Sequence, residues 1–470
     1  MPSPHYIAEK GIPALHTKVR EQVQRHLKEA TSIALTTDLW SSGVAPMSLL
    51  SLTAHWIDSS FTLHNVVLHA KEMLAKWDID NDKVHVVMRD NAANMKKAFA
   101  DMGVQSLGCF AHTLQLVVIQ GLLAQRSIID AVANARKLVG HFKHSPKAYS
   151  ILEDIQKDLH MPTQRLQQDV SVRWNSTQYM MLSLLQQKRP LSVYAADHDL
   201  PCMPSANQWA LMEKAVVVSS PFEELTRAVS AATASAADVI PAITVLKCHL
   251  SREESTDAGI KTMKRTLLEA VTEHFDYAET EPIYSVATLV DPRYKERFFT
   301  SPDHQELAKE ALIREVEIME RKRKAGSEVS TEEPPRKSPR RGGVGCAAAN
   351  SSFVSLYDEI LEGNVVESRP VSTSAVVTQV EADLAEQTIP RSENPLHYWR
   401  AHATQRPALA DTAMKFLCAP CTSVDSERLF SAVLNVLDEK RNRLTADKVQ
   451  VFVFIKKKPA LHFEEVSAVD

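Results

Sequence analysis

The sequence lacks any apolar run approaching the roughly 20 residues that a membrane-spanning helix needs. Its start, MPSPHYIAEKG, has no apolar stretch of the kind found in a secretory signal. Only 6 cysteines are scattered through 470 residues, too dispersed for a disulfide framework, which indicates a reducing compartment. Positive charge is not in excess either, because 54 Lys and Arg face 58 Asp and Glu. Any contact with DNA must therefore come from local basic patches, and no membrane partner is expected.

The first part of the chain alternates between strand-like and helix-like patterns. An apolar residue at every fourth position predicts a helix over 13–29. Apolar and polar residues alternate over 49–57, as in a strand with one buried face. Three closely spaced strands, followed by strand, helix, strand and helix, predict a mixed sheet covered by helices. The predicted strands span 32–39, 49–57, 61–69, 84–88 and 105–110, and the helices 71–77, 91–101 and 112–142.

The rest of the chain is predicted to be helical on either side of a polar stretch. Residues 177–320 are rich in Leu, Ala and Glu and have few strand signals. Residues 321–350 are rich in charge, Pro, Gly and Ser, so they cannot bury enough apolar surface to become ordered, and 363–392 is expected to be loose too. Amphipathic helices are predicted at 395–403, 408–418, 424–440 and 446–456.

Two aspartates stand where predicted strands end. Asp38 closes the first strand in LTTDLWSS, and Asp90 closes the fourth in VHVVMRDNAANM. If these strands are neighbours, both carboxylates lie at one edge of the sheet, where ligands bind in open sheets. A close carboxylate pair is a typical magnesium ligand set for phosphoryl transfer. The alternative is that each is an ordinary turn or cap residue.

Six segments resemble, in the same order, the motifs of hAT-superfamily transposases and the vertebrate zinc-finger BED-domain-containing proteins descended from them. They are LTTDLWSS, RDNAANM, CFAHTLQLVV, VRWNST, ATLVDPRY and SVDSERLFSAVLNVLDEKRNRL. The resemblance runs from about residue 8 to 458. It implies an α/β fold: a ribonuclease H-like mixed sheet with a large all-helical insertion and a helical C-terminal hAT dimerisation region. The implied parts are an N-terminal helical segment at 1–30, the first part of the core at 31–176, the insertion at 177–320, a mostly disordered linker at 321–392, and the dimerisation region completing the core at 393–460.

The resemblance also implies a catalytic triad of Asp38, Asp90 and Glu427, which would bind Mg²⁺ or Mn²⁺ and act on a DNA phosphodiester. For Glu427 the alternative is a first-turn glutamate stabilised by the helix dipole. The family carries the CxxH of CFAH near its active site, so His112 is a further catalytic candidate. Cys109 and His112 have the spacing of half a zinc site, but no second ligand pair lies nearby, so we expect no structural zinc.

Further positions follow from the same resemblance. Arg173 and Trp174 match the family's pair that meets unpaired bases, a role that fits a cation beside a stacking ring, although a buried structural Trp is the alternative. Cys418 and Cys421 form an isolated CxxC that we interpret as packing. The apolar face predicted for self-association comprises Leu429, Phe430, Val433, Val436 and Leu437. Two basic blocks resemble a bipartite nuclear import signal: Arg321, Lys322, Arg323 and Lys324, then Arg336, Lys337, Arg340 and Arg341.

Three departures from the family bear on activity. No CxxC followed by paired His, as in a BED finger, occurs in the sequence, and the first cysteine is Cys109. The crossover from Lys71 to Asp82 is close to the minimum length of about a dozen residues. Arg89 puts a positive charge directly before Asp90, where it competes with a metal ion. We therefore predict a nuclear, transposase-derived protein that dimerises, has DNA as a candidate partner and no longer transposes; the alternatives are an active metal-dependent transposase and a helical protein–protein scaffold.

Overall fold

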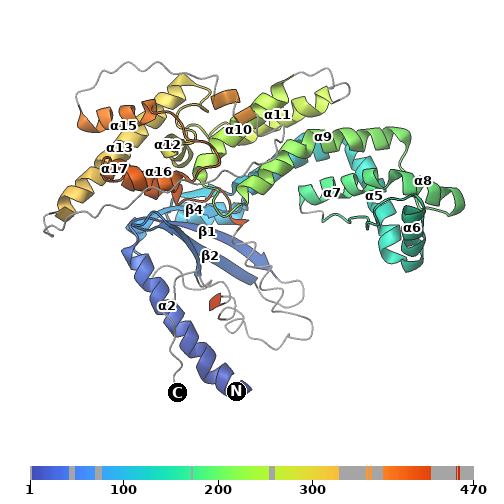
Figure 1. Cartoon of the computed structure of the whole chain (residues 1–470), viewed down its shortest axis with the longest axis horizontal. Coiled ribbons are helices and arrows are strands. Elements are labelled where there is room, and N and C mark those ends of the chain that lie inside the picture. The colour runs from blue at the N-terminus through green and yellow to red at the C-terminus, as the bar shows by residue number, and fades with distance from the viewer. Residues whose placement is uncertain are drawn as a thin grey trace. The chain divides into compact units, whose positions relative to one another are not determined.

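The computed structural model describes residues 3–41, 48–68, 77–170, 173–252, 260–327, 356–357, 359–361, 374–424, 451 and 454–455. The chain forms two compact units (Figure 1). One unit, the sheet unit, comprises Met1–His112, Val229–Pro241 and Ala278–Asp470. The other, the helical unit, comprises Thr113–Ala228 and Ala242–Tyr277. Each unit is described by itself.

The sheet unit is built on one five-stranded mixed sheet. The strands are β1 (Ile33–Ser41), β2 (Ser48–Ile57), β3 (Leu63–Leu68), β4 (Val84–Arg89) and β5 (Ser106–Gly108). Their order in the sheet is β3-β2-β1-β4-β5 (Figure 1). β1, β2 and β3 pair antiparallel, whereas β4 is parallel to β1 and β5 is parallel to β4. The predictions of a mixed sheet and of neighbouring first and fourth strands are confirmed.

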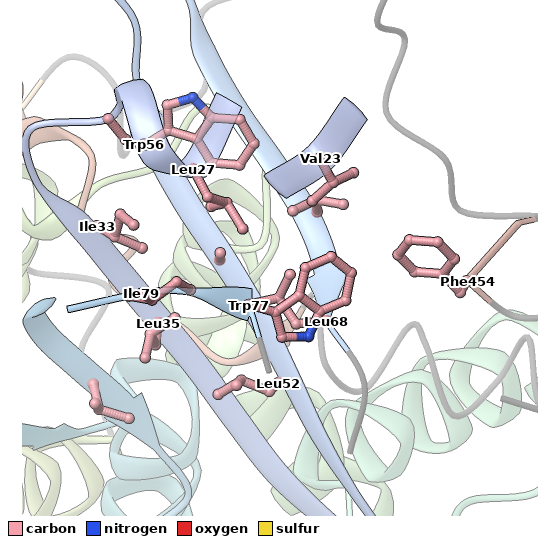
Figure 2. Packing of buried hydrophobic residues seen from close by; sticks show 14 of the residues in the cluster. Val23, Leu27, Ile33, Leu35, Leu52, Trp56, Leu68, Trp77, Ile79 and Phe454 are labelled. Carbon is pink, nitrogen blue, oxygen red and sulfur yellow. The ribbon is translucent and has the colours of Figure 1, made fainter. Parts of the chain in front are cut away.

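One face of this sheet is covered by α2 (Ile12–Glu29), which follows α1 (Pro4–Tyr6) and η1 (Ile7–Gly11). The predicted fourth-residue spacing places Val19, Val23 and Leu27 on one buried helix face. They pack in one apolar cluster with alternate residues of β1 and β2, and with Trp77 and Phe454 (Figure 2). Residue Phe454 therefore links the C-terminal region to the N-terminal helix.

The sheet unit also contains η3 (Asn81–Lys83), α3 (Ala93–Asp101), the start of α4 (Phe110–Val118), η5 (Ala236–Asp238), the start of α10 (Val239–Ser251), α12 (Pro282–Val290), α13 (Pro302–Ser327), α15 (Ala375–Ala385), α16 (Pro395–His402) and α17 (Pro407–Leu417). Of these, α3 lies on the same face as α2, because its Met95 and Phe99 belong to the same apolar cluster. We expected 363–392 to be loose, whereas α15 forms an ordered helix there. Val376 and Val380, four residues apart, give it a buried face. The buried Asp383 accepts a hydrogen bond from Tyr398 (3.0 Å) and pairs with Arg406, which fixes the end of this helix.

The helical unit contains the remainder of α4, η4 (Ile119–Leu123), α5 (Arg126–His144), α6 (Pro146–Asp158), α7 (Trp174–Gln186), α8 (Lys188–Asp197), α9 (Ala206–Val229), most of α10, and α11 (Lys261–Phe275). We predicted one helix over 112–142, but α4–η4 and α5 meet at a 100° bend. At Gly121 a Cβ would lie 2.8 Å from the Cα of Leu267, so only glycine permits this approach of α11. Among the described residues no single helix is long and apolar enough to cross a membrane.

Candidate functional site

Asp38 and Asp90 lie at the same level of two neighbouring parallel strands. The register pairs Thr36 of β1 with Met88 of β4. Asp38 stands two residues further along β1, and Asp90 directly follows β4, so the register brings the two residues to the same level. Contrary to the prediction, Asp38 does not close its strand, because β1 continues to Ser41 through its pairing with β2. Asp38 is buried, with 8% of its surface exposed, and Asp90 is half-buried.

Both carboxylates also have local hydrogen bonds. The Oδ1 of Asp38 accepts from the backbone N–H of Leu39 at 2.9 Å, and the Oδ1 of Asp90 accepts from that of Ala92 at 3.2 Å. The second bond is the turn that precedes α3, which is the ordinary structural role of a strand-ending Asp. Carboxylates held by backbone N–H groups keep further oxygen lone pairs for a cation. The two roles are thus compatible.

Arg89 brings a fixed positive charge to this edge. It is buried, with 7% of its surface exposed. Its Nε donates to the Oγ of Ser106 at 3.1 Å, and its Nη1 donates to the backbone carbonyl of Asp90 at 2.9 Å. These bonds hold the guanidinium between the ends of β4 and β5. A cation anchored there opposes the binding of a second one, because like charges repel strongly in a buried site.

The segment that precedes Glu427 docks at the end of β5. The backbone N–H of Phe110 donates to the carbonyl of Cys421 at 3.0 Å, and the backbone N–H of Ser423 donates to the sulfur of Cys109 at 3.2 Å. Cys109 itself donates to the carbonyl of Arg89 at 2.7 Å. Residues 421–423 therefore reach the edge that carries Asp90. Glu427 lies outside the described residues.

The thiol of Cys109 is buried and polarised by its neighbours. Burial raises its pKa, but hydrogen bonds from His112 and Ser423 and the charge of His112 outweigh burial, so the pKa is lowered from its usual value. His112 thus interacts with Cys109 inside the sheet unit. A role for His112 at the active site, including a contact with phosphate, stays a prediction.

Cys418 and Cys421 are both buried. Burial raises the pKa of Cys418 to about 12 and raises that of Cys421 as well. Neutral buried thiols pack as small apolar groups, which supports the packing interpretation. Among the described residues, no three His, Cys, Asp or Glu side chains lie together as metal ligands.

A turn at residues 235–238 contacts the segment that precedes Glu427. The backbone N–H of Ala236 donates to the carbonyl of Ala419 at 2.8 Å, and the hydroxyl of Thr422 donates to the carbonyl of Val229 at 3.4 Å. Ser235 and Asp238 form a capping box that shapes the turn. The chain leading to Glu427 is therefore held here by one backbone hydrogen bond and by one from a side-chain hydroxyl.

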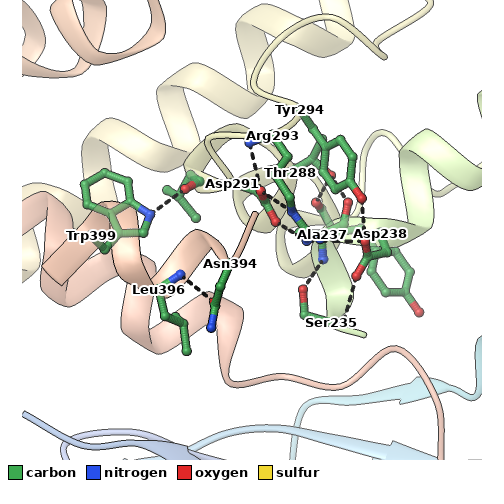
Figure 3. Close-up of polar contacts among 12 residues, drawn as sticks. Ser235, Ala237, Asp238, Thr288, Asp291, Arg293, Tyr294, Asn394, Leu396 and Trp399 are labelled. Atoms are coloured by element: carbon green, nitrogen blue, oxygen red, sulfur yellow. Dashed lines mark hydrogen bonds and ion pairs between the residues drawn. The ribbon is translucent and has the colours of Figure 1, made fainter. Parts of the chain in front are cut away.

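Figure 3 shows the buried ionic cluster that holds this turn. Arg293 bridges Asp291, at 2.6 Å, and Asp238, at 3.3 Å. The hydroxyl of Tyr294 donates to Asp238 at 2.6 Å. Asp291 is fully buried; burial raises its pKa, although the adjacent Arg293 opposes this. For the motif that contains Asp291 and Arg293 the sequence indicates a structural turn and no chemistry, and in the structure these residues hold the turn at 235–238.

Arg173 and Trp174 begin α7 in the helical unit, and they differ in exposure. Arg173 is exposed, whereas only 4% of the surface of Trp174 is exposed. A base can stack only on an exposed ring face, so burial favours the structural alternative for Trp174. Arg173 retains a side chain that can reach a phosphate.

The remaining predicted residues divide between the described and the undescribed parts of the chain. Arg321, Lys322, Arg323 and Lys324 form a turn of helix near the end of α13, where Arg323 pairs with Asp411 at 2.6 Å. The following residues lie outside the described part: Glu427, Leu429, Phe430, Val433, Val436, Leu437, Arg336, Lys337, Arg340 and Arg341.

Comparisons with known proteins agree with these features. Residues 379–459 match the hAT family C-terminal dimerisation region, and residues 107–218 match the ZBED1 RNase-like helical domain. Over 99% of its length the chain is 28% identical to human zinc finger BED domain-containing protein 4, and covers 41% of it. Over 97% of its length it is 26% identical to human zinc finger BED domain-containing protein 6, and it covers 51% of that protein. Over 96% of its length it is 24% identical to the putative AC transposase of Zea mays, and it covers 59% of that protein.

The matches confirm the resemblance found in the motifs. The chain is a transposase-derived protein related to the hAT transposases. Among the relatives, zinc finger BED domain-containing proteins 4 and 6 share nearly all of its length. The chain spans about half the length of the curated relatives it matches.

Proposed function

We propose that this protein is a nuclear, transposase-derived protein that self-associates through its C-terminal region, contacts DNA and no longer transposes it. The observation that carries the proposal is the docking of residues 421–423 on Cys109 and Phe110 at the sheet edge of Asp38 and Asp90. These three residues lie within the match to the hAT dimerisation region. The C-terminal region is thus part of the core in this chain, as a transposase-derived fold requires.

The strand order supports a ribonuclease H-like core. Three antiparallel strands are followed by two parallel ones, in the order β3-β2-β1-β4-β5. This arrangement puts Asp38 of β1 and Asp90 after β4 at the same level, which is where such a core would carry its first two carboxylates. Glu427 comes four residues after Ser423 in the sequence, and four residues span about 14 Å at most. The anchored Ser423 therefore leaves Glu427 within reach of this edge.

The three carboxylates are suitable ligands for a divalent cation, but a neighbouring positive charge opposes its binding. Asp38, Asp90 and Glu427 would supply the oxygen ligands that Mg²⁺ and Mn²⁺ prefer, and the bound ion would polarise a phosphodiester. Arg89, held by Ser106 and the carbonyl of Asp90, occupies this edge with a permanent positive charge. We infer that Arg89 weakens cation binding enough to abolish strand transfer.

Self-association is tested by sedimentation velocity at micromolar concentration. We expect the full chain to sediment as a dimer or larger, because the apolar face at 429–437 needs a surface to cover it. The double variant Leu429→Asp with Val433→Asp should shift it to monomer. Leu307→Asp, at an exposed position of α13, is the matched control and should leave the assembly unchanged. A wild-type chain that sediments only as monomer would refute this part of the proposal.

A second candidate is an active transposase, favoured by the shared edge of Asp38 and Asp90. It differs from the first in one property, metal-dependent cleavage of DNA.

A further inference from the structure

A basic surface follows one side of the helical unit. We define the α5–α6 basic surface by Lys143 in the last turn of α5, Lys147 in the first turn of α6, and Arg165 and Arg173 in the segment that follows. All four side chains are exposed. Among the described residues, none of them takes part in an ion pair, so their charges face solvent.

The segment carrying the two arginines is fixed against the helices. Arg165 lies over the ring of Tyr149 in α6, with 4.7 Å from its Cζ to the ring centroid. Four residues later, Asp169 accepts two hydrogen bonds from Arg136 of α5, at 2.7 and 2.9 Å. The segment therefore runs from the start of α6 to the middle of α5. Arg165 and Arg173 are positioned by this tether rather than left on a free loop.

Several acidic side chains near this surface are engaged by cations. Asp169 pairs with Arg136, and Glu153 and Asp154 share Lys157. Burial raises the pKa of Asp169, but the bonds from Arg136 outweigh it and lower the pKa, so this carboxylate remains ionised and occupied. The unpaired cations thus leave a local positive field on a chain whose net charge is −4.

Gly140 marks an opening in the same surface. It lies on the α5 face between Arg136 and Lys143, four residues after one and three before the other. A Cβ built on Gly140 meets nothing within 4 Å, so no packing in the described structure requires a glycine there. A glycine inside a helix is less stable than an alanine there. A bare helix backbone flanked by cations lets another molecule approach closely.

We propose that the α5–α6 basic surface binds the phosphate backbone of duplex DNA, and that Gly140 leaves room for that backbone against α5. This inference rests on the DNA contact of the proposed function, and it assigns the contact to Lys143, Lys147 and Arg165 together with Arg173. Lysine and arginine contacts to phosphate release counterions, so they give affinity without reading sequence. The buried Trp174 is not needed for such binding.

The test measures fluorescence anisotropy of a labelled random-sequence duplex with the full chain, over salt concentrations of about 50 to 200 mM. The double variant Lys143→Gln with Arg165→Gln should bind the duplex roughly tenfold more weakly than wild type. It should also lower the slope of log affinity against log salt concentration by about 2, since each phosphate contact contributes about 0.9 to that slope. Lys188→Gln with Arg189→Gln, which removes the same charge at the exposed start of α8, is the control and should bind within about twofold of wild type.

A second variant separates folding from binding. Gly140→Gln places a long neutral side chain in the open space, so thermal stability should stay equal or rise while DNA affinity falls several-fold. Two results would overturn the assignment and leave the proposed function intact. One is an equal loss of DNA affinity in the α8 control; the other is unchanged DNA affinity in both the double variant and Gly140→Gln. A wild-type chain that binds no duplex at all would overturn both.

Discussion

Ser423 donates its backbone N–H to the sulfur of Cys109 across 3.2 Å, although 314 residues separate them in the sequence. The bond ties the C-terminal region to the end of β5. With the bond from Phe110 to Cys421, it makes the region matched by the dimerisation model a part of the sheet unit. Self-association and the integrity of the sheet edge therefore depend on the same segment.

The ionic cluster beneath this segment should be among the most sensitive positions of the sheet unit. Arg293→Met leaves the fully buried Asp291 without its partner, so we expect the free energy of unfolding to fall by about 3–5 kcal/mol. Arg314→Met, which breaks an exposed pair with Glu310, should cost less than about 1 kcal/mol. Urea denaturation of both variants measures the difference. Equal losses would mean that the cluster does not support the fold.

His85 should make stability depend on pH. Burial, then the charge of Lys415, lowers its pKa from 6.5 to about 3. In the unfolded chain the group titrates near its ordinary value, so protons bind preferentially to the unfolded state. Its contribution to stability is complete above about pH 6.5 and is lost as pH falls toward 3, by up to about 1.4 kcal/mol per unit.

Replacement of His85 isolates this effect. In urea titrations between pH 7 and pH 5, we expect the stability of His85→Leu to decline less steeply than that of wild type. His144→Gln, at an exposed histidine of α5, is the control and should follow the wild-type profile. Parallel profiles for wild type and His85→Leu would show that the buried imidazole does not titrate with unfolding.

Local patterns were enough to predict much of the sheet unit. The fourth-residue spacing of α2 and the alternation in β2 each create one buried face, and that face is visible in a single segment of sequence. The placement of Asp38 and Asp90 on neighbouring strands followed from the same patterns, once β1 and β4 were taken as neighbours, although β1 extends beyond Asp38 to Ser41. Such features depend on residues close together in the chain.

Features that depend on distant partners could not be predicted in this way. Nothing near Ser423 indicates that its N–H meets Cys109. The helix α15 is short, and its end is fixed by the contacts of Asp383 with its distant partners Tyr398 and Arg406, which no local pattern contains. The close approach of α11 at Gly121 and the bend between Leu123 and Arg126 likewise involve distant elements. For Trp174 the sequence left base stacking and burial open, because its burial depends on the packing of the whole helical unit.

Arg89 is expected to control the affinity of the sheet edge for divalent cations. Arg89→Ser removes the fixed charge beside Asp90, so we expect Mn²⁺ to bind at least about tenfold more tightly than to wild type, as measured by calorimetry. Glu427→Gln in the Arg89→Ser background should abolish the gain if Glu427 completes the site. Arg126→Ser, at an exposed position of α5, is the control. A gain that survives Glu427→Gln would remove Glu427 from the proposed triad.

The wild-type chain should not cleave DNA. The purified protein is incubated with Mn²⁺ and with hairpin or inverted-repeat DNA from a related hAT element, and the strands are separated on a denaturing gel. We expect no cleavage, because the cation held at the edge by Ser106 and the carbonyl of Asp90 competes with the metal ion for the carboxylates. The Arg89→Ser variant makes the result informative, since weak nicking that appears there and disappears on Asp90→Ala would locate the block at Arg89. Cleavage by the wild-type chain that disappears in Asp90→Ala would instead establish an active transposase, and the proposed loss of activity would be wrong.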